Sequence, residues 1–240
     1  RTGKTLGGVG QAASPAGWLY PDLGGRNLAT CLSRMSQYFT IHPQNPQPRL
    51  IRHAVDIIRQ GGVVVLPTDS SYAIACHLDD KSAVERIRRI RELDKKHNFT
   101  LVCRDLSEIS TYARVDNSAY RLLKAKTPGA YTFLLRATAT VPRRLQHPKR
   151  KSIGIRVPDH PIVTALLIEH AQPLMSTTLI LPGNEFPETD AFHIRDKLES
   201  QVDLIIDGGP CGLEFTTVVD LTESVPQLIR YGKGSTEGLT

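Results

Sequence analysis

Residues 63–66 form an uninterrupted apolar run, VVVL, which ends at Pro67. A short β-branched run without polar alternation is typical of a strand that is buried on both faces of a sheet. The segment before it, 50–58, carries apolar residues at helical spacing, and the pair Gly61 and Gly62 supplies a helix stop. A helix that leads directly into a buried strand is the building unit of a layered α/β fold.

The same alternation continues along the chain. It predicts further helices at 81–93, 118–126 and 161–170, and strands at 99–103, 130–135, 153–158, 173–180, 202–209, 216–221 and 227–232. We therefore expect an α/β fold with a twisted, mixed central sheet flanked by helices.

A cluster of small polar residues follows the first predicted strand. Residues 68–72 read TDSSY, so Thr68, Ser70 and Tyr72 place their hydroxyl groups just beyond the strand end. In open α/β sheets, ligands bind in the crevice outside the carboxyl ends of the strands. This cluster therefore predicts a site for a polar ligand.

Charge and cysteine content narrow the partners and the compartment. The 240-residue chain has a formal net charge of +6, which favours anionic partners such as nucleotides or RNA. Its four cysteines form no C-x-x-C motif or Cys/His cluster, so we expect no protein-bound metal, no disulfide framework and a reducing, cytoplasmic location. No apolar stretch approaches the roughly 20 residues of a membrane span, so we expect no membrane partner.

The first 34 residues differ in character from the rest. They are rich in Gly and Ala and show no sustained helical or strand period. We expect residues 1–34 to be a flexible extension or a non-native segment, with Met35 as the start of the native chain. A single domain is expected over 35–234, followed by a C-terminal tail at 235–240.

The predicted helix at 81–93 carries an arginine on its apolar face. At about 100° per residue, Arg91 projects between Val84 and Ile87. A guanidinium on the buried side of a helix is costly unless it is paired or faces a ligand. Two alternatives remain open, an ion pair with a carboxylate and a place in a binding site near the helix end.

Several segments, in this order and with this spacing, resemble the YrdC/YciO family, and the resemblance extends over about residues 35–234. The segments are PTDSSY (67–72), TPGAYTF (127–133), IGIRVPDHP (153–161), LMSTT (174–178), VDLIIDGG (202–209), TTVVDL (216–221) and IRYGKG (229–234). The segment HNFTLVCRDLSE at 97–108 is especially similar to the YciO branch. The resemblance implies a YrdC-like fold with an open cleft.

The resemblance also implies a reaction class. Members of the YrdC branch make threonylcarbamoyl-AMP from L-threonine, bicarbonate and ATP, with release of pyrophosphate, as the first step toward threonylcarbamoyladenosine in tRNA. ATP is then a substrate, and Mg²⁺ is expected to be carried by its phosphates rather than by a protein cage. Such a nucleotidyltransferase acts mainly by aligning reactants and stabilising charge on phosphate oxygens.

The family's cleft residues match positions of this chain. The resemblance implies catalytic roles for Arg91, Ser176 and Thr178. It implies substrate binding by Thr68, Ser70, Tyr72, Thr132, Arg156, Thr216, Thr217 and Arg230. Thr132 and Thr217 have an alternative structural role, because β-branched residues are common in strands. Arg156 lies within an apolar strand, and we expect its guanidinium to clamp a carboxylate or a phosphate.

Three departures separate this chain from catalytic relatives. Those relatives carry a Lys-x-Arg pair and a Ser-x-Asn pair, where this chain has Arg91-Glu92-Leu93 and Ser176-Thr177-Thr178. Cys103 replaces a histidine that is often found in the family. A hydrogen bond to a charged group contributes roughly 1.5–3 kcal/mol. The replacement of an arginine by Leu93 is therefore expected to slow the reaction by about 10- to 100-fold.

These departures leave alternatives to a weak synthase. One is a non-catalytic protein that retains the fold and binds tRNA or double-stranded RNA. It is indicated by the basic segment 142–151, PRRLQHPKRK, which lies beside the arginine-rich helix in this interpretation. The other is a related carbamoyl- or nucleotide-handling activity on a different substrate.

Overall fold

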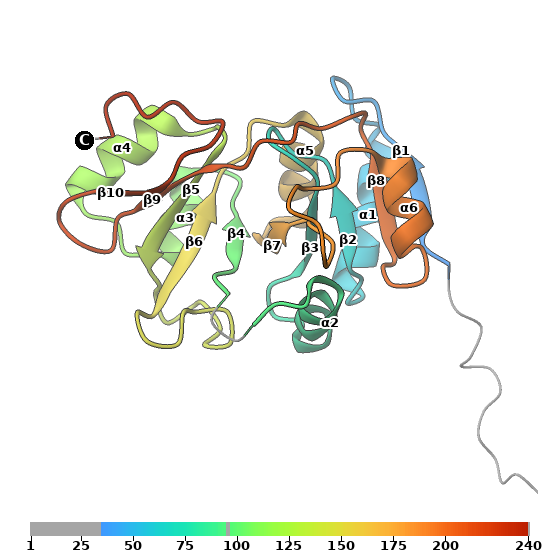
Figure 1. Cartoon of the computed structure of the whole chain (residues 1–240), viewed down its shortest axis with the longest axis horizontal. Helices are drawn as coiled ribbons and strands as arrows, with labels where there is room; N and C mark the ends of the chain where they lie inside the picture. Colours follow the sequence, from blue (N-terminus) through green and yellow to red (C-terminus); the bar gives the residue numbers. More distant parts are fainter. Residues whose placement is uncertain (1–34, 95–96, 240) are drawn as a thin grey trace, which may run out of the picture. The chain divides into compact units, whose positions relative to one another are not determined.

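The structure is a computed structural model that describes residues 35–94 and 97–239. The extension predicted for 1–34 lies outside the described residues. Within the described part, the chain forms a ten-stranded sheet and six α-helices (Figure 1). None of these helices is long and apolar enough to cross a membrane.

The sheet mixes parallel and antiparallel pairs. Its order is β1-β8-β2-β3-β7-β4-β6-β5-β9-β10, and the β1–β8, β8–β2, β4–β6 and β5–β9 pairs are parallel. The prediction of an α/β fold with a mixed sheet is therefore confirmed. The strands are β1 (Gln37–Thr40), β2 (Val64–Leu66), β3 (Ala73–His77), β4 (Thr100–Val102), β5 (Tyr131–Arg136), β6 (Ser152–Arg156), β7 (Leu174–Thr178), β8 (Leu204–Asp207), β9 (Thr217–Asp220) and β10 (Gln227–Arg230).

Helices pack on both faces of the sheet. On one face, α1 and α5 pack against each other and form an apolar cluster with β2, β3 and β8. The other four helices contribute to the larger apolar cluster on the opposite face. The helices are α1 (Pro48–Arg59), α2 (Lys81–Arg91), α3 (Leu106–Tyr112), α4 (Asn117–Lys126), α5 (Pro161–His170) and α6 (Ala191–Leu198).

The face that carries α1 and α5 is only half covered. Its apolar cluster extends along the strand order as far as Leu174 on β7 and Val102 on β4. Farther along, Thr100 lies opposite both Ser176 and Gly154, so these positions share that same face. Strand alternation places apolar residues of these strands on the opposite, covered face. At these positions the uncovered half of the sheet therefore presents small and polar side chains.

The end of α2 decides where Arg91 lies. Asp80 caps the helix by accepting a hydrogen bond from the backbone N of Ala83 at 2.8 Å, and Glu92 ends it with a left-handed φ of 49°. The helix thus stops at Arg91, two residues before the predicted end at Leu93. Because the chain turns immediately after Arg91, this side chain projects from the last helical turn.

Residues 235–239 pack onto the domain. The Tyr131 hydroxyl donates to the carbonyl of Ser235 at 2.9 Å, and Leu239 is only 4% exposed. The described part of the predicted tail, 235–239, is thus attached to the sheet. The connection between β8 and β9, residues 208–216, crosses from one half of the sheet to the other (Figure 1).

Candidate functional site

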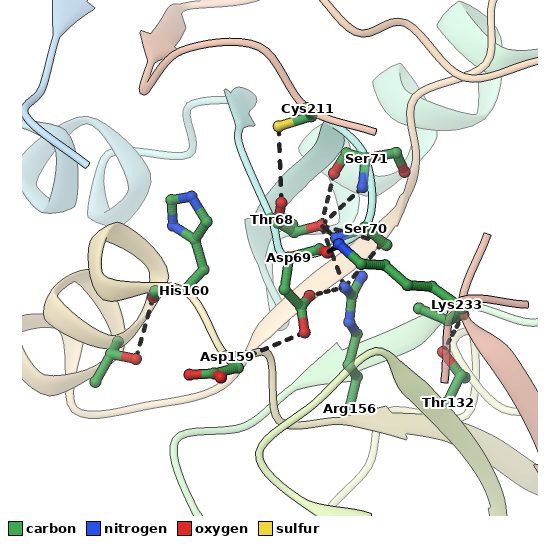
Figure 2. A network of polar contacts seen from close by, with 12 residues as sticks. Thr68, Asp69, Ser70, Ser71, Thr132, Arg156, Asp159, His160, Cys211 and Lys233 are labelled. Carbon is green, nitrogen blue, oxygen red and sulfur yellow. Dashed lines mark hydrogen bonds and ion pairs between the residues drawn. The ribbon is translucent and has the colours of Figure 1, made fainter. Parts of the chain in front are cut away.

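The loop after β2 is held by a network of polar contacts (Figure 2). Thr68 Oγ1 donates to the carbonyl of Ser71 at 2.6 Å and accepts from the backbone N–H groups of Ser70 and Ser71 at 3.3 Å. The Cys211 thiol donates to the carbonyl of Thr68 at 3.7 Å. The hydroxyl group of Thr68 thus stabilises the turn at 68–71, and Cys211 of the β8–β9 connection contacts the same turn.

Arg156 is engaged by this loop. Its Nη2 donates to Asp69 Oδ1, to Ser70 Oγ at 2.9 Å and to Thr68 Oγ1 at 3.2 Å. The second carboxylate oxygen of Asp69 accepts from the backbone N of Asp159 at 3.0 Å. Arg156 is 7% exposed, and burial lowers its pKa while the Asp69 carboxylate acts in the opposite direction. Nη2 of the guanidinium therefore orients the loop, and the expected role of Arg156 in binding a ligand stays a prediction.

Two other predicted binding residues are fully buried. Tyr72 is 0% exposed, its hydroxyl donates to the carbonyl of Gly209 at 2.8 Å, and burial raises its pKa. Thr217 is also 0% exposed, and its Oγ1 donates to the carbonyl of Gly234 at 2.6 Å. Thr217 thus holds the segment that carries Gly234, and Tyr72 supports the segment that carries Gly209.

A hollow of about 410 Å³ opens on the uncovered half of the sheet. Four predicted site residues, Thr132, Thr178, Thr216 and Arg230, contribute to it. Its lining contains no carboxylate among the described residues. The other residues that line it are His97, Asn98, Thr100, Leu134, Thr177, Val218 and Ile229. The hollow therefore offers neutral hydroxyl groups and a cation to a ligand.

The cation and two hydroxyl groups of the hollow contact one another. Thr132 Oγ1 and Thr216 Oγ1 lie 2.9 Å apart. Arg230 donates from Nε and Nη2 to the carbonyl of Thr216, at 3.2 and 3.1 Å, and its guanidinium stacks over the Phe215 ring at 4.8 Å. Burial lowers the pKa of Arg230, and no described carboxylate lies within ion-pair distance of it. The Arg230 charge is therefore available to an anion.

The hollow and the loop network adjoin each other. Phe133 of β5 pairs with Ile155 of β6, so Thr132 and Arg156 are neighbours at the next position of this antiparallel pair. Figure 2 shows Thr132, Arg156 and Asp69 in one region. Thr68, Ser70, Thr132 and Arg156, which come from distant segments of the sequence, thus lie together in this part of the domain.

His97 belongs to the hollow although the sequence did not single it out. Its Nε2 lies 3.1 Å from Thr177 Oγ1, and its ring packs edge-on against Phe99. Burial, together with the charges of Arg91 and Arg88, lowers the pKa of His97 to about 4. The imidazole is therefore neutral near pH 7 and hydrogen-bonds as a neutral group.

Two of the three predicted catalytic residues lie outside the lining of the hollow. Arg91 Nη1 donates to the carbonyl of Ile180, and burial lowers its pKa to about 10. This contact holds the segment that follows β7, and no described carboxylate forms an ion pair with Arg91. A place for Arg91 in a binding site near the helix end stays a prediction. Ser176 Oγ donates to the carbonyl of Thr100 at 3.4 Å. Of the three, only Thr178 lines the hollow.

The basic segment 142–151 lies against α2, as Arg88 Nη2 donates to the carbonyl of Arg144 at 3.4 Å. Two of its arginines have structural contacts. Arg144 donates to the carbonyl of Leu78 at 3.0 Å, and Arg150 forms an ion pair with Asp220 at 3.3 Å. Its exposed cations without a described carboxylate partner are Arg143, Lys149 and Lys151.

Known proteins are similar to this chain in sequence and in fold. The family model of the Sua5/YciO/YrdC proteins, described as "Telomere recombination", matches residues 56–232. The chain is also 60% identical over 200 residues to the uncharacterized protein YciO of Escherichia coli K12, covering 83% of this chain and 97% of the relative. The chain belongs to the Sua5/YciO/YrdC family. The resemblance found in the sequence is thereby confirmed.

Solved structures and a curated enzyme extend the Sua5/YciO/YrdC relationship. The crystal structure of E. coli YciO matches with a TM-score of 0.82 at 59% identity, over 85% of this chain and 98% of that one. A Pyrococcus abyssi Sua5 structure complexed with L-threonine matches with a TM-score of 0.76 at 26% identity, over 82% of this chain and 58% of that one. A threonylcarbamoyl-AMP synthase of Vibrio vulnificus is 30% identical over 161 residues, covering 66% of this chain and 86% of the enzyme.

Proposed function

We propose that this chain is a threonylcarbamoyl-AMP synthase-like nucleotidyltransferase, with a low rate, that binds ATP and L-threonine in the hollow. The observation that carries the proposal is the lining of the hollow, which combines hydroxyl groups and the unpaired cation Arg230 without a described carboxylate. An anionic substrate meets no like charge there. The family relationship to threonylcarbamoyl-AMP synthases supports the same conclusion.

The proposed reaction asks little acid–base chemistry of the protein. Threonine and bicarbonate first form a carbamate on the amino nitrogen, and water leaves. A carbamate oxygen then bonds to the α-phosphorus of ATP while the bond from that phosphorus to the bridging oxygen breaks. Pyrophosphate departs with the electron pair of this bond. Catalysis is then a matter of alignment and charge stabilisation, with Mg²⁺ carried by the phosphates.

The described residues divide these tasks. Arg230 stabilises charge on the substrate anions, and the hydroxyl groups of Thr132, Thr178 and Thr216 donate hydrogen bonds from the open face. Arg156 keeps the 68–71 loop in position through Asp69 and leaves anion binding to other cations. Leu93 packs against the core, where catalytic relatives are expected to carry an arginine. This loss of one cation is the physical reason for the low rate.

The test supplies the purified chain with ATP, Mg²⁺, bicarbonate and L-threonine and measures pyrophosphate release. We expect release that depends on threonine. Arg230→Met should lower kcat/KM by about 10- to 100-fold, because it removes a charged hydrogen-bond donor. Arg121→Met removes an exposed arginine of α4 that does not line the hollow, and it should leave the rate unchanged. Absence of any threonine-dependent release rules the proposal out.

A second candidate function is the binding of tRNA or double-stranded RNA. It is favoured by Arg143, Lys149 and Lys151 beside α2, which are exposed and have no described carboxylate partner. Affinity for duplex RNA should fall steeply with salt, because binding to phosphates releases counterions. Lys149→Glu combined with Lys151→Glu should weaken binding further in a fluorescence-anisotropy titration. No binding by the unaltered chain at low salt contradicts this candidate.

A further inference from the structure

The C-terminal residues 231–239, called here the strap, lie against the first residues of β5 and β9. The side chain of Thr217 holds the carbonyl of Gly234 at 2.6 Å, and that of Tyr131 holds the carbonyl of Ser235 at 2.9 Å. Both anchoring side chains come from neighbouring strands of the sheet. The strap is therefore held on β5 and β9 by one buried and one partly buried hydrogen bond.

Two glycines bring the strap backbone unusually close to the sheet. A Cβ atom on Gly232 would lie 2.4 Å from the carbonyl oxygen of Phe215, and one on Gly234 would lie 2.5 Å from Cε1 of Tyr131. Such distances leave no room for a side chain at either position. Lys233 lies between these glycines, and its backbone N donates to the carbonyl of Phe215 at 2.8 Å. The backbone of Lys233 is thereby fixed in place.

The Lys233 side chain extends from the strap to the loop after β2. Its Nζ donates to the backbone carbonyl of Asp69 at 2.5 Å. Figure 2 shows the extended side chain running from the region of Thr132 to the loop, next to Arg156. Lys233 thus links the strap with the loop network that Arg156 orders.

The Asp69 carboxylate does not form an ion pair with Lys233. Both oxygens of the Asp69 carboxylate are engaged, one by Arg156 and the other by the backbone N of Asp159. No described carboxylate lies within ion-pair distance of Lys233. An ammonium group has three hydrogen-bond donors, and a single described acceptor, the Asp69 carbonyl, uses one. Two donors and a full positive charge remain at the border of the site.

We propose that Lys233 is a ligand-contacting residue that binds the anionic group of the substrate, a phosphate or a carboxylate. This inference rests on the proposed function of the hollow and adds a residue to it. Arg156 is neutralised by Asp69, so the border of the site presents two uncompensated cations, Arg230 and Lys233, which are three positions apart on the same segment. An anion between the hollow and the loop is bound by this pair.

The test measures dissociation constants of ATP, AMP, pyrophosphate and L-threonine by calorimetry. Lys233→Met removes the charge and keeps most of the side-chain length, and it should weaken binding of the contacted ligand by about 10- to 100-fold. Lys233→Arg keeps the charge and should retain affinity within a few-fold. Lys124→Met, on exposed α4, is the matched control and should behave like the unaltered chain.

The ligands distinguish the two sources of negative charge. Weaker binding of ATP and pyrophosphate but not of L-threonine assigns the contact to the phosphate chain, and the reverse pattern assigns it to the amino-acid carboxylate. Loss of the charge contact should also reduce the dependence of affinity on NaCl, which a purely structural role of Lys233 would not do.

Failure of this inference is distinct from failure of the proposed function. If the unaltered chain binds the ligands and Lys233→Met, folded as shown by its melting temperature, binds them equally well, Lys233 has no contact with the substrate and the proposed function stands. A lowered affinity that Lys233→Arg does not restore and that keeps its salt dependence also overturns the inference. If the unaltered chain binds none of the four ligands, both proposals are wrong.

Discussion

Replacement of His170 by phenylalanine should make the fold less sensitive to acid. His170 is the last residue of α5, is 4% exposed, and has no hydrogen-bond partner for either ring nitrogen among the described residues. The His77 ring of β3 packs edge-on against it, with 5.3 Å between ring centroids, and Arg59 of α1 donates to its carbonyl. Burial, with the charges of His77 and Arg59, lowers the pKa of His170 to about 4.

The expected magnitude follows from this pKa. The unfolded chain protonates His170 near pH 6.5, so the unfolded state takes up a proton before the folded state does. The stabilising contribution is complete above about pH 6.5 and is lost as the pH falls toward 4. The folded and unfolded pKa values of His170 differ by about 2.5, and one pKa unit corresponds to about 1.36 kcal/mol, so the free energy of unfolding changes by about 3 kcal/mol. The C-terminal end of a helix favours a protonated histidine, which reduces the expected value to about 2 kcal/mol.

Urea unfolding between pH 7 and pH 4 measures this effect. The free energy of unfolding should fall with decreasing pH in the unaltered chain, and His170→Phe should remove about 2 kcal/mol of that fall. His97, with a pKa lowered to about 4 but with a partly exposed side chain, adds a smaller loss that this variant keeps. His193→Gln, on the exposed side of α6, is the control. An unchanged pH dependence in His170→Phe refutes the argument from burial.

Three further perturbations test the site and its supports. Arg156→Met should lower the free energy of unfolding by about 3–5 kcal/mol in urea, because it leaves the Asp69 carboxylate unpaired; an effect below 1 kcal/mol would mean that the pair is solvated. Gly234→Ala should cost about 1–3 kcal/mol by the same assay, since its methyl group overlaps Tyr131, and a neutral result contradicts the tight seating of the strap. Leu93→Arg should raise threonine-dependent pyrophosphate release by about 10-fold or more, and an unchanged rate at an unchanged melting temperature shows that this departure does not limit the reaction.

The sequence predicted most of the helices and strands and missed β1, β3, α3 and α6. β3, Ala73–His77, follows a turn so closely that its five residues show neither alternation nor a flanking glycine or proline. α6 spans only Ala191–Leu198, although its cap was readable, since Asp190 accepts from the backbone N of His193 at 2.9 Å. In both cases the tertiary environment, rather than local periodicity, decides the structure.

The sequence predicted several residues of the candidate site but not the contacts that each of them makes. Thr132, Thr216 and Arg230 do meet in the hollow, as expected from the distant segments that carry them. The contact between Arg156 and Asp69 could not be predicted, because an arginine in an apolar strand gives the same sequence pattern whether it contacts a ligand or an aspartate of the chain. Lys233 gave no signal either, as its role depends on two close backbone approaches that only the folded strap reveals.

Among the described residues, no helix covers one half of the sheet, and this affects how the ligand specificity of the fold can change. Threonine and valine have similar shapes and a similar preference for strands, so the exchange of a hydroxyl group for a methyl group on this wall keeps the strand propensity. Each such exchange alters which hydrogen bonds a bound molecule can make and leaves the opposite, helix-covered layer intact. Substitutions on this wall can therefore change which small molecule is bound, while the apolar core on the opposite face keeps its packing.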